Sequence, residues 1–177
     1  VGKMLIKVLA KKRIPLINIV RREEQKQTLK SLGAEYVLNS SDEHFEKELK
    51  ELAAKLNATI AFDAIGGDST WQVLKNMPTS STIYVYGVLS HKDVGGIDPG
   101  ALLGLNQTIK GFLLSYWLAE KNKLELLRII MRVQSEINTD FRPEINKLFS
   151  LSQANEAVKY YNENMSKGKN IIKPWMK

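Results

Sequence analysis

Short apolar runs alternate with amphipathic segments along most of the chain, and this alternation predicts a parallel β-sheet with crossover helices. The runs that read as buried strands are rich in β-branched residues and lie at positions 15–20, 35–38, 59–64, 82–86 and 108–114. The segments that read as helices lie at positions 2–12, 23–32, 40–56, 68–76 and 121–138. This order is typical of a doubly wound α/β sheet, in which ligands bind outside the carboxyl ends of the strands.

Three helix boundaries carry local signals of their own. Gly33 follows an amphipathic segment and is a good helix terminator. Two capping boxes, Ser40-x-x-Glu43 and Ser150-x-x-Gln153, predict the starts of two further helices.

The pattern changes in the last part of the chain. Positions 142–151 look extended, a helix is expected from the second capping box to Met165, and positions 170–173 read as a last short strand. This order does not continue the strand–helix repeats of the main sheet. The preceding helix, over 121–138, is expected to turn four apolar residues inward: Leu124, Leu127, Ile130 and Ile137.

The net charge of +7 originates at one end of the chain. Residues 1–30 hold nine Lys and Arg and two Glu, a difference of seven, whereas residues 31–177 hold seventeen charges of each sign. A basic segment can bind nucleic acid, a membrane surface or a phosphate-bearing ligand, and surface charge on a helix is the common alternative. No aromatic residue lies among these cations, so a stacking surface for single-stranded nucleic acid is not supported.

Several classes of site and location are disfavoured by what the sequence does not contain. Because it has no cysteine, it has no disulfide, no catalytic thiol and no thiolate zinc site. His44 and His91 have no partners at ligand spacing, so we interpret them as surface or loop residues and predict no metal site. The sequence shows no apolar run long enough to span a membrane and no signal-peptide pattern.

Candidate chemistry gathers where three of the predicted strands end. Arg21 and Arg22 follow the first strand, and glycines follow two later strands, at 65–67 and 87–90. An acidic residue at the first of these ends holds the ribose of NAD, whereas arginine suits the 2′-phosphate of NADP. Glycine lets a ligand approach the backbone. The alternatives are that each arginine is a solvated residue at a helix start and each glycine only part of a turn.

Six short segments, taken together and in this order, resemble the medium-chain dehydrogenase/reductase family. They are Val1-Gly2, Ile19-Val20-Arg21-Arg22, Leu32-Gly33-Ala34-Glu35, Phe62-Asp63-Ala64-Ile65-Gly66-Gly67, Tyr86-Gly87-Val88-Leu89-Ser90 and Gly168-Lys169. The sequence is most similar to the zinc-independent quinone-oxidoreductase and enoyl-thioester reductase branches. The segment 109–117 resembles the part of the enoyl reductases that carries aromatic residues near the nicotinamide.

The resemblance implies a Rossmann-type fold that binds NADP(H). Gly2 would be the last glycine of the phosphate-binding loop, Phe112 or Trp117 would line the nicotinamide, and Asp63 would have a structural role. The expected cofactor-binding residues are Gly2, Arg21, Arg22, Gly66, Gly67, Gly87, Val88, Leu89, Phe112 and Trp117. No catalytic residue or proton donor is assigned in this chain.

The resemblance also implies a division into two domains. Residues 1–140 would form the NADP-binding Rossmann-like domain, and residues 141–177 would return into a catalytic domain. The first strand of the sheet and most of the catalytic domain are not found in the sequence, so we expect a longer polypeptide. That first strand would lie between strands 15–20 and 59–64. Because both would keep open edges without it, we expect residues 1–177 alone not to form a stable, cofactor-competent monomer.

The function expected from this resemblance is hydride transfer from NADPH to a carbonyl or an activated double bond, as in a quinone, an enone or a 2-enoyl thioester. The first alternative is a non-catalytic subunit or scaffold that retains the reductase fold, and the second is a nucleic-acid or anionic-surface binder. We expect a small-molecule substrate, a homodimer or larger assembly, no nucleic acid partner and no membrane insertion. The expected location is the cytoplasm or the mitochondrial matrix.

Overall fold

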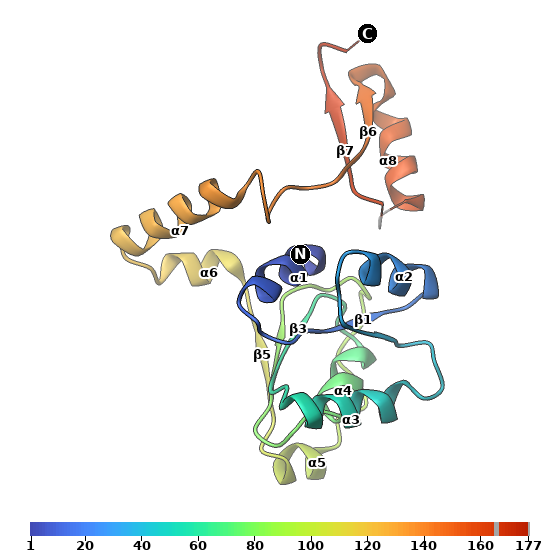
Figure 1. Ribbon diagram of the computed structural model, residues 1–177, viewed down its shortest axis with the longest axis vertical. Coiled ribbons are helices and arrows are strands. Elements are labelled where there is room, and N and C mark those ends of the chain that lie inside the picture. Colours follow the sequence, from blue (N-terminus) through green and yellow to red (C-terminus); the bar gives the residue numbers. More distant parts are fainter. Residues whose placement is uncertain (165–166, 177) are drawn as a thin grey trace. The chain divides into compact units, whose positions relative to one another are not determined.

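The computed structural model describes residues 1–164 and 167–176 and is shown in Figure 1. The chain divides into two compact units, Val1–Leu126 and Leu127–Lys177. The division falls within helix α7, Lys123–Glu136. The proposed assignment of residues 1–140 and 141–177 to two functional domains stays a prediction.

The first unit alternates helices and strands, as the hydrophobic pattern predicted. Its helices are α1 Gly2–Lys11, α2 Glu23–Ser31, α3 Phe45–Leu56, α4 Asp68–Leu74, α5 Pro99–Gly104 and α6 Leu114–Ala119. Its strands are β1 Ile17–Val20, β2 Tyr36–Asn39, β3 Ile60–Asp63, β4 Thr82–Val85 and β5 Thr108–Gly111. The sequence did not predict α5 and α6. Helix α5 begins where Asp98 accepts a hydrogen bond from Gly100 N and Pro99 occupies the first turn.

The strands of the first unit are all parallel, but they form two separate sheets. Strand β1 pairs with β2, and β3, β4 and β5 pair in that order. In the doubly wound order the first strand lies between the second and the fourth, which are β1 and β3 here. The parallel strands with their intervening helices confirm the predicted Rossmann-type α/β fold. Among the described residues no strand lies between β1 and β3.

Neighbouring side chains of β2 point to opposite faces and define two apolar clusters. Val37 packs with Ile6 and Ala34 beneath α1 and α2, whereas Leu38 packs with Phe45 and Leu49 of α3. A third cluster joins α4 to the other sheet through Trp71, Leu74, Met77 and Ile83. This alternation follows from the two-residue period of a strand.

Helices α3 and α4 form one layer that reaches across both sheets. Val73 of α4 packs against the α3 cluster as well as against the cluster on β4. At the helix–helix contact, Lys75 Nζ lies 2.8 Å from Glu46 Oε2, and Gln72 Nε2 donates to Glu46 Oε1 at 3.2 Å. The two sheets therefore belong to one compact unit although no strand joins them.

The expectation that α7 turns its apolar side chains inward is wrong for the residues it named. All four are exposed: Leu124, Leu127, Ile130 and Ile137. Their spacing predicted the helix correctly. A helical period places apolar residues on one stripe, but it does not specify the surface that buries the stripe.

The second unit contains a strand–helix–strand arrangement with its own small sheet. Strand β6, Ile145–Ser150, leads through the 3₁₀ turn η1, Leu151–Gln153, into helix α8, Ala154–Glu163. Strand β7, Lys169–Lys173, then pairs with β6 in parallel. This sheet is separate from the main one, as predicted. The predicted helix end at Met165 lies outside the described residues.

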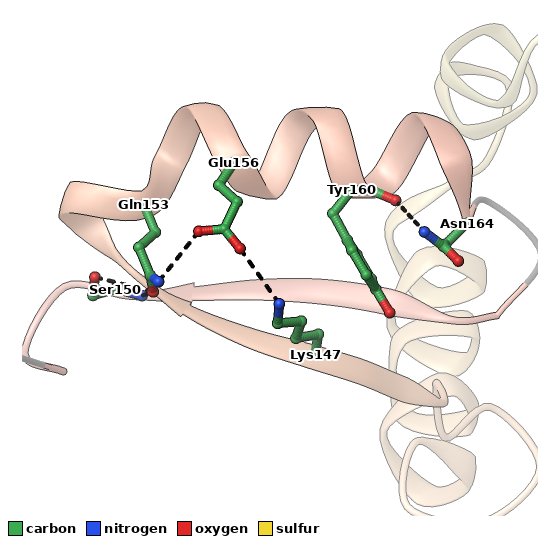
Figure 2. Close-up of polar contacts among 6 residues, drawn as sticks. All are labelled: Lys147, Ser150, Gln153, Glu156, Tyr160 and Asn164. Carbon is green, nitrogen blue, oxygen red and sulfur yellow. Dashed lines mark hydrogen bonds and ion pairs between the residues drawn. The ribbon is translucent and has the colours of Figure 1, made fainter.

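Contacts between β6 and α8 hold the second unit together. Phe149 of β6 is fully buried, and its ring lies 5.8 Å from that of Tyr160. Lys147 Nζ lies 4.8 Å from the centre of each of these rings. It also lies 3.4 Å from Glu156 Oε1, an ion pair drawn in Figure 2. The lysine thus combines cation–π contacts with an ion pair where its stem borders the apolar core.

The two predicted capping boxes have different outcomes. At Ser150 both bonds of the box are present, and Gln153 Oε1 accepts from Ser150 N at 3.1 Å (Figure 2). The box at Ser40 is wrong, because α3 starts at Phe45 and its N-cap, His44, makes no side-chain cap bond. Asp42 Oδ1 instead accepts from His44 N at 2.9 Å, so a local turn replaces the predicted cap.

We expect Ser150→Ala to lower the free energy of unfolding of the second unit by roughly 0.5–2 kcal/mol, because an orphan donor of the first turn loses its acceptor. Chemical denaturation followed by circular dichroism measures this change. Ser40→Ala is the matched control and should cost less than about 0.5 kcal/mol, since the box at Ser40 is not formed. Equal losses in the two variants would contradict the interpretation.

Candidate functional site

The loop after β3 is held by the side chain of Asp63. This buried carboxylate accepts from Ile65 N at 2.7 Å and Gly66 N at 3.2 Å through Oδ1. Its Oδ2 accepts from Thr70 Oγ1 at 2.6 Å. Asp63 therefore ties the end of β3 to the first turns of α4, a structural role in keeping with the resemblance. An aspartate just before a glycine turn is the sequence signal for this bond.

The two glycines of this loop adopt backbone conformations that other residues rarely take. Gly66 has φ of 71° and Gly67 has φ of 68°, and both are buried. A Cβ placed on Gly67 would lie 2.9 Å from Ser90 Oγ, in the loop after β4. The glycines are thus required by the turn itself and by the neighbouring loop.

The loops after β3 and β4 are joined directly through their backbones. Leu89 N donates to Ala64 O at 3.2 Å, and Ser90 N donates to Ile65 O at 2.8 Å. A Cβ on Gly87 would lie 2.6 Å from Ala64 O and 3.1 Å from Ala64 Cα. The close approach of the Ala64 backbone therefore requires a residue without Cβ at position 87. The predicted role of Gly87, close approach of a ligand, stays a prediction.

Two apolar side chains beyond this junction remain available for contact. Val88 is 66% exposed and Leu89 is 68% exposed, although both lie next to the fixed backbone of the joined loops. Exposed aliphatic side chains on a rigid loop are suited to covering the flat face of a ring.

The predicted aromatic residues lie together at the end of β5. Phe112 follows the strand, and its N–H donates to Val85 O at 2.9 Å. The Phe112 and Trp117 rings lie 6.4 Å apart with an interplanar angle of 48°. Lys121 Nζ lies 4.9 Å from the centre of the Trp117 ring. The structure thus brings the aromatic pair to the same edge of the sheet as the joined loops.

Arg21 and Arg22 lie at the carboxyl end of β1, in the other sheet. Both are exposed, and no hydrogen bond or ion pair joins either guanidinium to a residue within 1–164 or 167–176. Their backbone is held: Arg21 N donates to Gln25 Oε1 at 3.1 Å, and Ser41 Oγ donates to Arg21 O at 3.0 Å. The turn that carries the two cations is therefore fixed, while their guanidinium groups have no partner within the described residues.

The predicted site residues form two groups rather than one. Gly66, Gly67, Gly87, Val88, Leu89, Phe112 and Trp117 belong to β3–β5 and the segments that follow them, and Arg21 and Arg22 belong to β1. Gly2 opens α1, and a Cβ there would have no heavy atom within 4 Å. In the described part of the chain, no backbone hydrogen bond joins the two groups.

A shallow, open pocket of about 360 Å³ lies beside α3 and α4 and was not predicted from the sequence. Its lining residues come from both helices and a glycine loop, namely Glu46, Asp68, Trp71, Gln72, Lys75, Gly95 and Gly96. A hydrogen bond from Lys75 lowers the pKa of Glu46 below its ordinary value, and Gln72 contributes in the same direction. Because the site depends on which helices meet, no local sequence signal identified it.

Tyr86 stands at the end of β4, close to Asp63. Burial raises the pKa of its hydroxyl, and the negative charge of Asp63 adds to the effect. The phenol therefore stays protonated to a higher pH than that of an ordinary tyrosine. His44 Nε2 lies 3.4 Å from Glu43 Oε1 at the surface. Within residues 1–164 and 167–176, no three His, Asp or Glu side chains form a group that could hold a metal ion. In that same part of the chain, no helix is both long and apolar enough to cross a membrane.

The sequence matches a known family over most of its length. Residues 1–129 match the family described as zinc-binding dehydrogenase. One curated relative, the mitochondrial enoyl-[acyl-carrier-protein] reductase of Xenopus tropicalis, is 28% identical over 140 residues. This match covers 76% of the present chain but 39% of the relative, so the chain spans about two fifths of the relative's length.

Two solved structures show the same fold. A Mesorhizobium loti protein described as an NADPH:quinone reductase superposes with a TM-score of 0.83 and 26% identity, over 97% of this chain and 49% of that one. An Etr1p mutant in complex with NADP and crotonyl-CoA superposes with a TM-score of 0.66 and 18% identity, over 84% of this chain and 45% of that one. Both similarities cover more than four fifths of the chain.

We expect Gly87→Ala to destabilise the first unit by roughly 1–3 kcal/mol, because the new methyl group meets the backbone of Ala64. Thermal unfolding followed by circular dichroism measures the loss. Gly104→Ala is the control, since a Cβ at this helical glycine meets nothing within 4 Å. The control should be neutral or stabilising by up to about 1 kcal/mol. A Gly87→Ala protein as stable as the parent would contradict the close approach.

The lowered pKa of Glu46 predicts a pH-dependent contribution to stability. A depressed carboxyl pKa stabilises the fold above the ordinary value of 4.5, and this stabilisation is lost as the pH falls through the folded value. The stability difference between the parent and Glu46→Gln should therefore shrink between about pH 6 and about pH 3. Urea titrations at each pH measure it, with Glu51→Gln on the same helix as the control. Because Glu46 is partly exposed, solvent screening keeps the effect small.

Proposed function

The chain belongs to the zinc-binding dehydrogenase family, in keeping with its resemblance to the medium-chain dehydrogenases/reductases, and on this premise we propose that it carries the cofactor-binding part of an NADPH-dependent oxidoreductase. The oxidoreductase class itself is supported by the matched family and by the relatives. Because the chain spans about two fifths of the first relative, the activity proposed is that of the whole protein.

The observation that carries the choice of NADPH is the pair Arg21 and Arg22. Both guanidinium groups are exposed at the carboxyl end of β1, where the ribose of a dinucleotide binds in this fold. Arg22 is the N-cap of α2 with an extended backbone, and Ser41 holds the carbonyl of Arg21. Free guanidinium donors on a fixed turn suit the bidentate recognition of a phosphate.

At the other end of the site we propose that the joined loops and the aromatic pair position the nicotinamide. The backbone from Gly87 to Leu89 is fixed by its bonds to the β3 loop, and Val88 and Leu89 present exposed apolar side chains. Phe112 and Trp117 would form a second wall. The cofactor, when bound, supplies the hydride, and these residues orient the ring and exclude water from it.

We propose a carbonyl or an activated double bond as the hydride acceptor, in a quinone, an enone or a 2-enoyl thioester. The names of the similar proteins include enoyl-[acyl-carrier-protein] reductase and NADPH:quinone reductase, which supports these classes. We assign no proton donor within the chain. We further propose that the protein works as a homodimer or in a larger assembly, in the mitochondrial matrix or the cytoplasm. The name of the Xenopus tropicalis relative, a mitochondrial enzyme, supports the mitochondrial matrix.

We expect the protein to bind NADPH more tightly than NADH, and the double variant Arg21→Ala, Arg22→Ala to lose this preference. A bidentate charge-assisted contact to phosphate is worth roughly 1.5–3 kcal/mol, or about tenfold to a hundredfold in affinity. Calorimetric titration of both nucleotides into the parent and the variant measures the effect. Affinity for NADH should change little in the variant, because NADH lacks the 2′-phosphate.

The control is Lys7→Ala, Lys12→Ala, which removes the same charge from exposed positions in and just after α1. If the arginines contact the phosphate directly, the lysine variant keeps the preference for NADPH. If only the net charge matters, both variants lose it. Equal affinities of the parent for NADPH and NADH would contradict the proposed preference for NADPH. Tight NADPH binding without reductase activity on any of the three acceptor classes would favour the non-catalytic alternative.

A further inference from the structure

The backbone of Arg21 lies where strand β1 has ended and helix α2 has not yet begun. Regular structure holds its neighbours on both sides. Val20 O accepts from Ser40 N at 2.7 Å, and Arg22 O accepts from two amides in the first turn of α2 at 3.1 and 3.2 Å. Among the described residues, no backbone group bonds to the N–H or the C=O of Arg21 itself.

Two side chains from different elements bond to these backbone groups instead. Gln25 Oε1, in the first turn of α2, accepts from Arg21 N at 3.1 Å. Ser41 Oγ, in the loop after β2, donates to Arg21 O at 3.0 Å. Asn39 Oδ1 accepts from Ser41 N at 3.0 Å, so the residue that carries the hydroxyl is itself held at the end of β2. The peptide groups on both sides of Arg21 Cα are therefore anchored.

Neither bond completes the cap of α2 or satisfies a buried polar group. In a capping box the third helical residue bonds to the amide of the N-cap. The N-cap of α2 is Arg22, and Gln25 reaches the residue before it. Both bonds are exposed to solvent. Because water can replace the missing partner at an exposed site, losing either bond leaves no buried donor or acceptor unsatisfied.

The two bonds fix the direction in which the side chain of Arg21 leaves the backbone. A guanidinium group recognises a phosphate best through two parallel N–H···O bonds, a geometry that depends on orientation. A long side chain on a mobile backbone loses more conformational entropy when it binds than one on a fixed backbone. Anchoring the backbone at Arg21 therefore favours phosphate binding without adding a contact to the phosphate.

From these observations we propose that Gln25 and Ser41 are positioning residues for recognition of the 2′-phosphate of NADPH. Gln25 acts through the N–H of Arg21, and Ser41 acts through its C=O. This role rests on the proposed choice of NADPH and extends it, because discrimination between the two nucleotides then depends on two uncharged residues as well as on the arginines. Affinity for NADH does not depend on them, since NADH has no 2′-phosphate.

The test compares two small probes, adenosine 2′,5′-bisphosphate and adenosine 5′-phosphate, which differ only in the 2′-phosphate. Both are titrated calorimetrically into the whole protein and into its variants Gln25→Met and Ser41→Ala. Each variant should lose about threefold to tenfold in affinity for the bisphosphate, the effect of one hydrogen bond, and keep its affinity for the monophosphate. Because neither substitution changes the net charge, a general electrostatic effect does not account for such a loss.

Matched controls separate positioning from a loss of structure. Gln27→Met makes the same substitution on the same helix, where the side chain bonds to Glu23, and Ser31→Ala removes a hydroxyl that bonds within α2. Both controls should keep the preference of the parent. Ser41→Thr keeps the hydroxyl and should restore the affinity that Ser41→Ala loses. If circular dichroism shows that Gln25→Met is unfolded, the comparison of Ser41→Ala with Ser41→Thr decides the question.

The results that would overturn the positioning role differ from those that would overturn the cofactor choice. Equal affinity of the parent for the two probes would contradict the preference for NADPH, and the positioning role would fail with it. A parent that prefers the bisphosphate, with Gln25→Met and Ser41→Ala keeping the full preference, would refute the positioning role alone. Equal losses in the variants and in their matched controls would refute it as well.

Discussion

The close approach of two backbones, at Gly87 and Ala64, is the contact on which the candidate site depends. Parallel pairing of β3 with β4 brings the chains together, and only a residue without Cβ allows Gly87 to lie against the Ala64 carbonyl. The bonds from Leu89 and Ser90 to the β3 loop follow from this approach. Asp63 then fixes the same loop from within, so the backbone of both strand ends is rigid before any ligand is considered.

The joined loops after β3 and β4 are rigid, whereas β1 and β3 belong to two separate sheets. The layer of α3 and α4 carries the packing across both sheets through Val73, and the Glu46–Lys75 pair reinforces it. Helix packing can therefore preserve the arrangement of a doubly wound fold where the hydrogen-bonded ladder is broken. Among the described residues, Ile60 and Phe62 of β3 are exposed and neither β1 nor β3 has a second neighbouring strand.

This arrangement has a consequence for function. The arginines that would bind a 2′-phosphate and the loops that would hold a nicotinamide stand on different sheets. A dinucleotide site in this fold spans the crevice at the carboxyl ends of the strands, so it requires both groups at one edge. The proposed cofactor binding therefore depends on how the two groups are held relative to one another.

The sequence by itself determined the features that depend on neighbouring residues: the order of helices and strands, the cap at Ser150, the helix end at Gly33 and the cations after β1. The prediction was wrong at Ser40, where a local turn competes with the helix cap, and it missed the helix start at Pro99. Only the tertiary structure decided that the Ala64 backbone leaves no room for a Cβ at Gly87, which side chains of α7 are exposed, and which helices line the open pocket. The physical reason is that burial and close approach arise from segments far apart in the chain, whereas a hydrophobic period or a capping residue acts within a few residues.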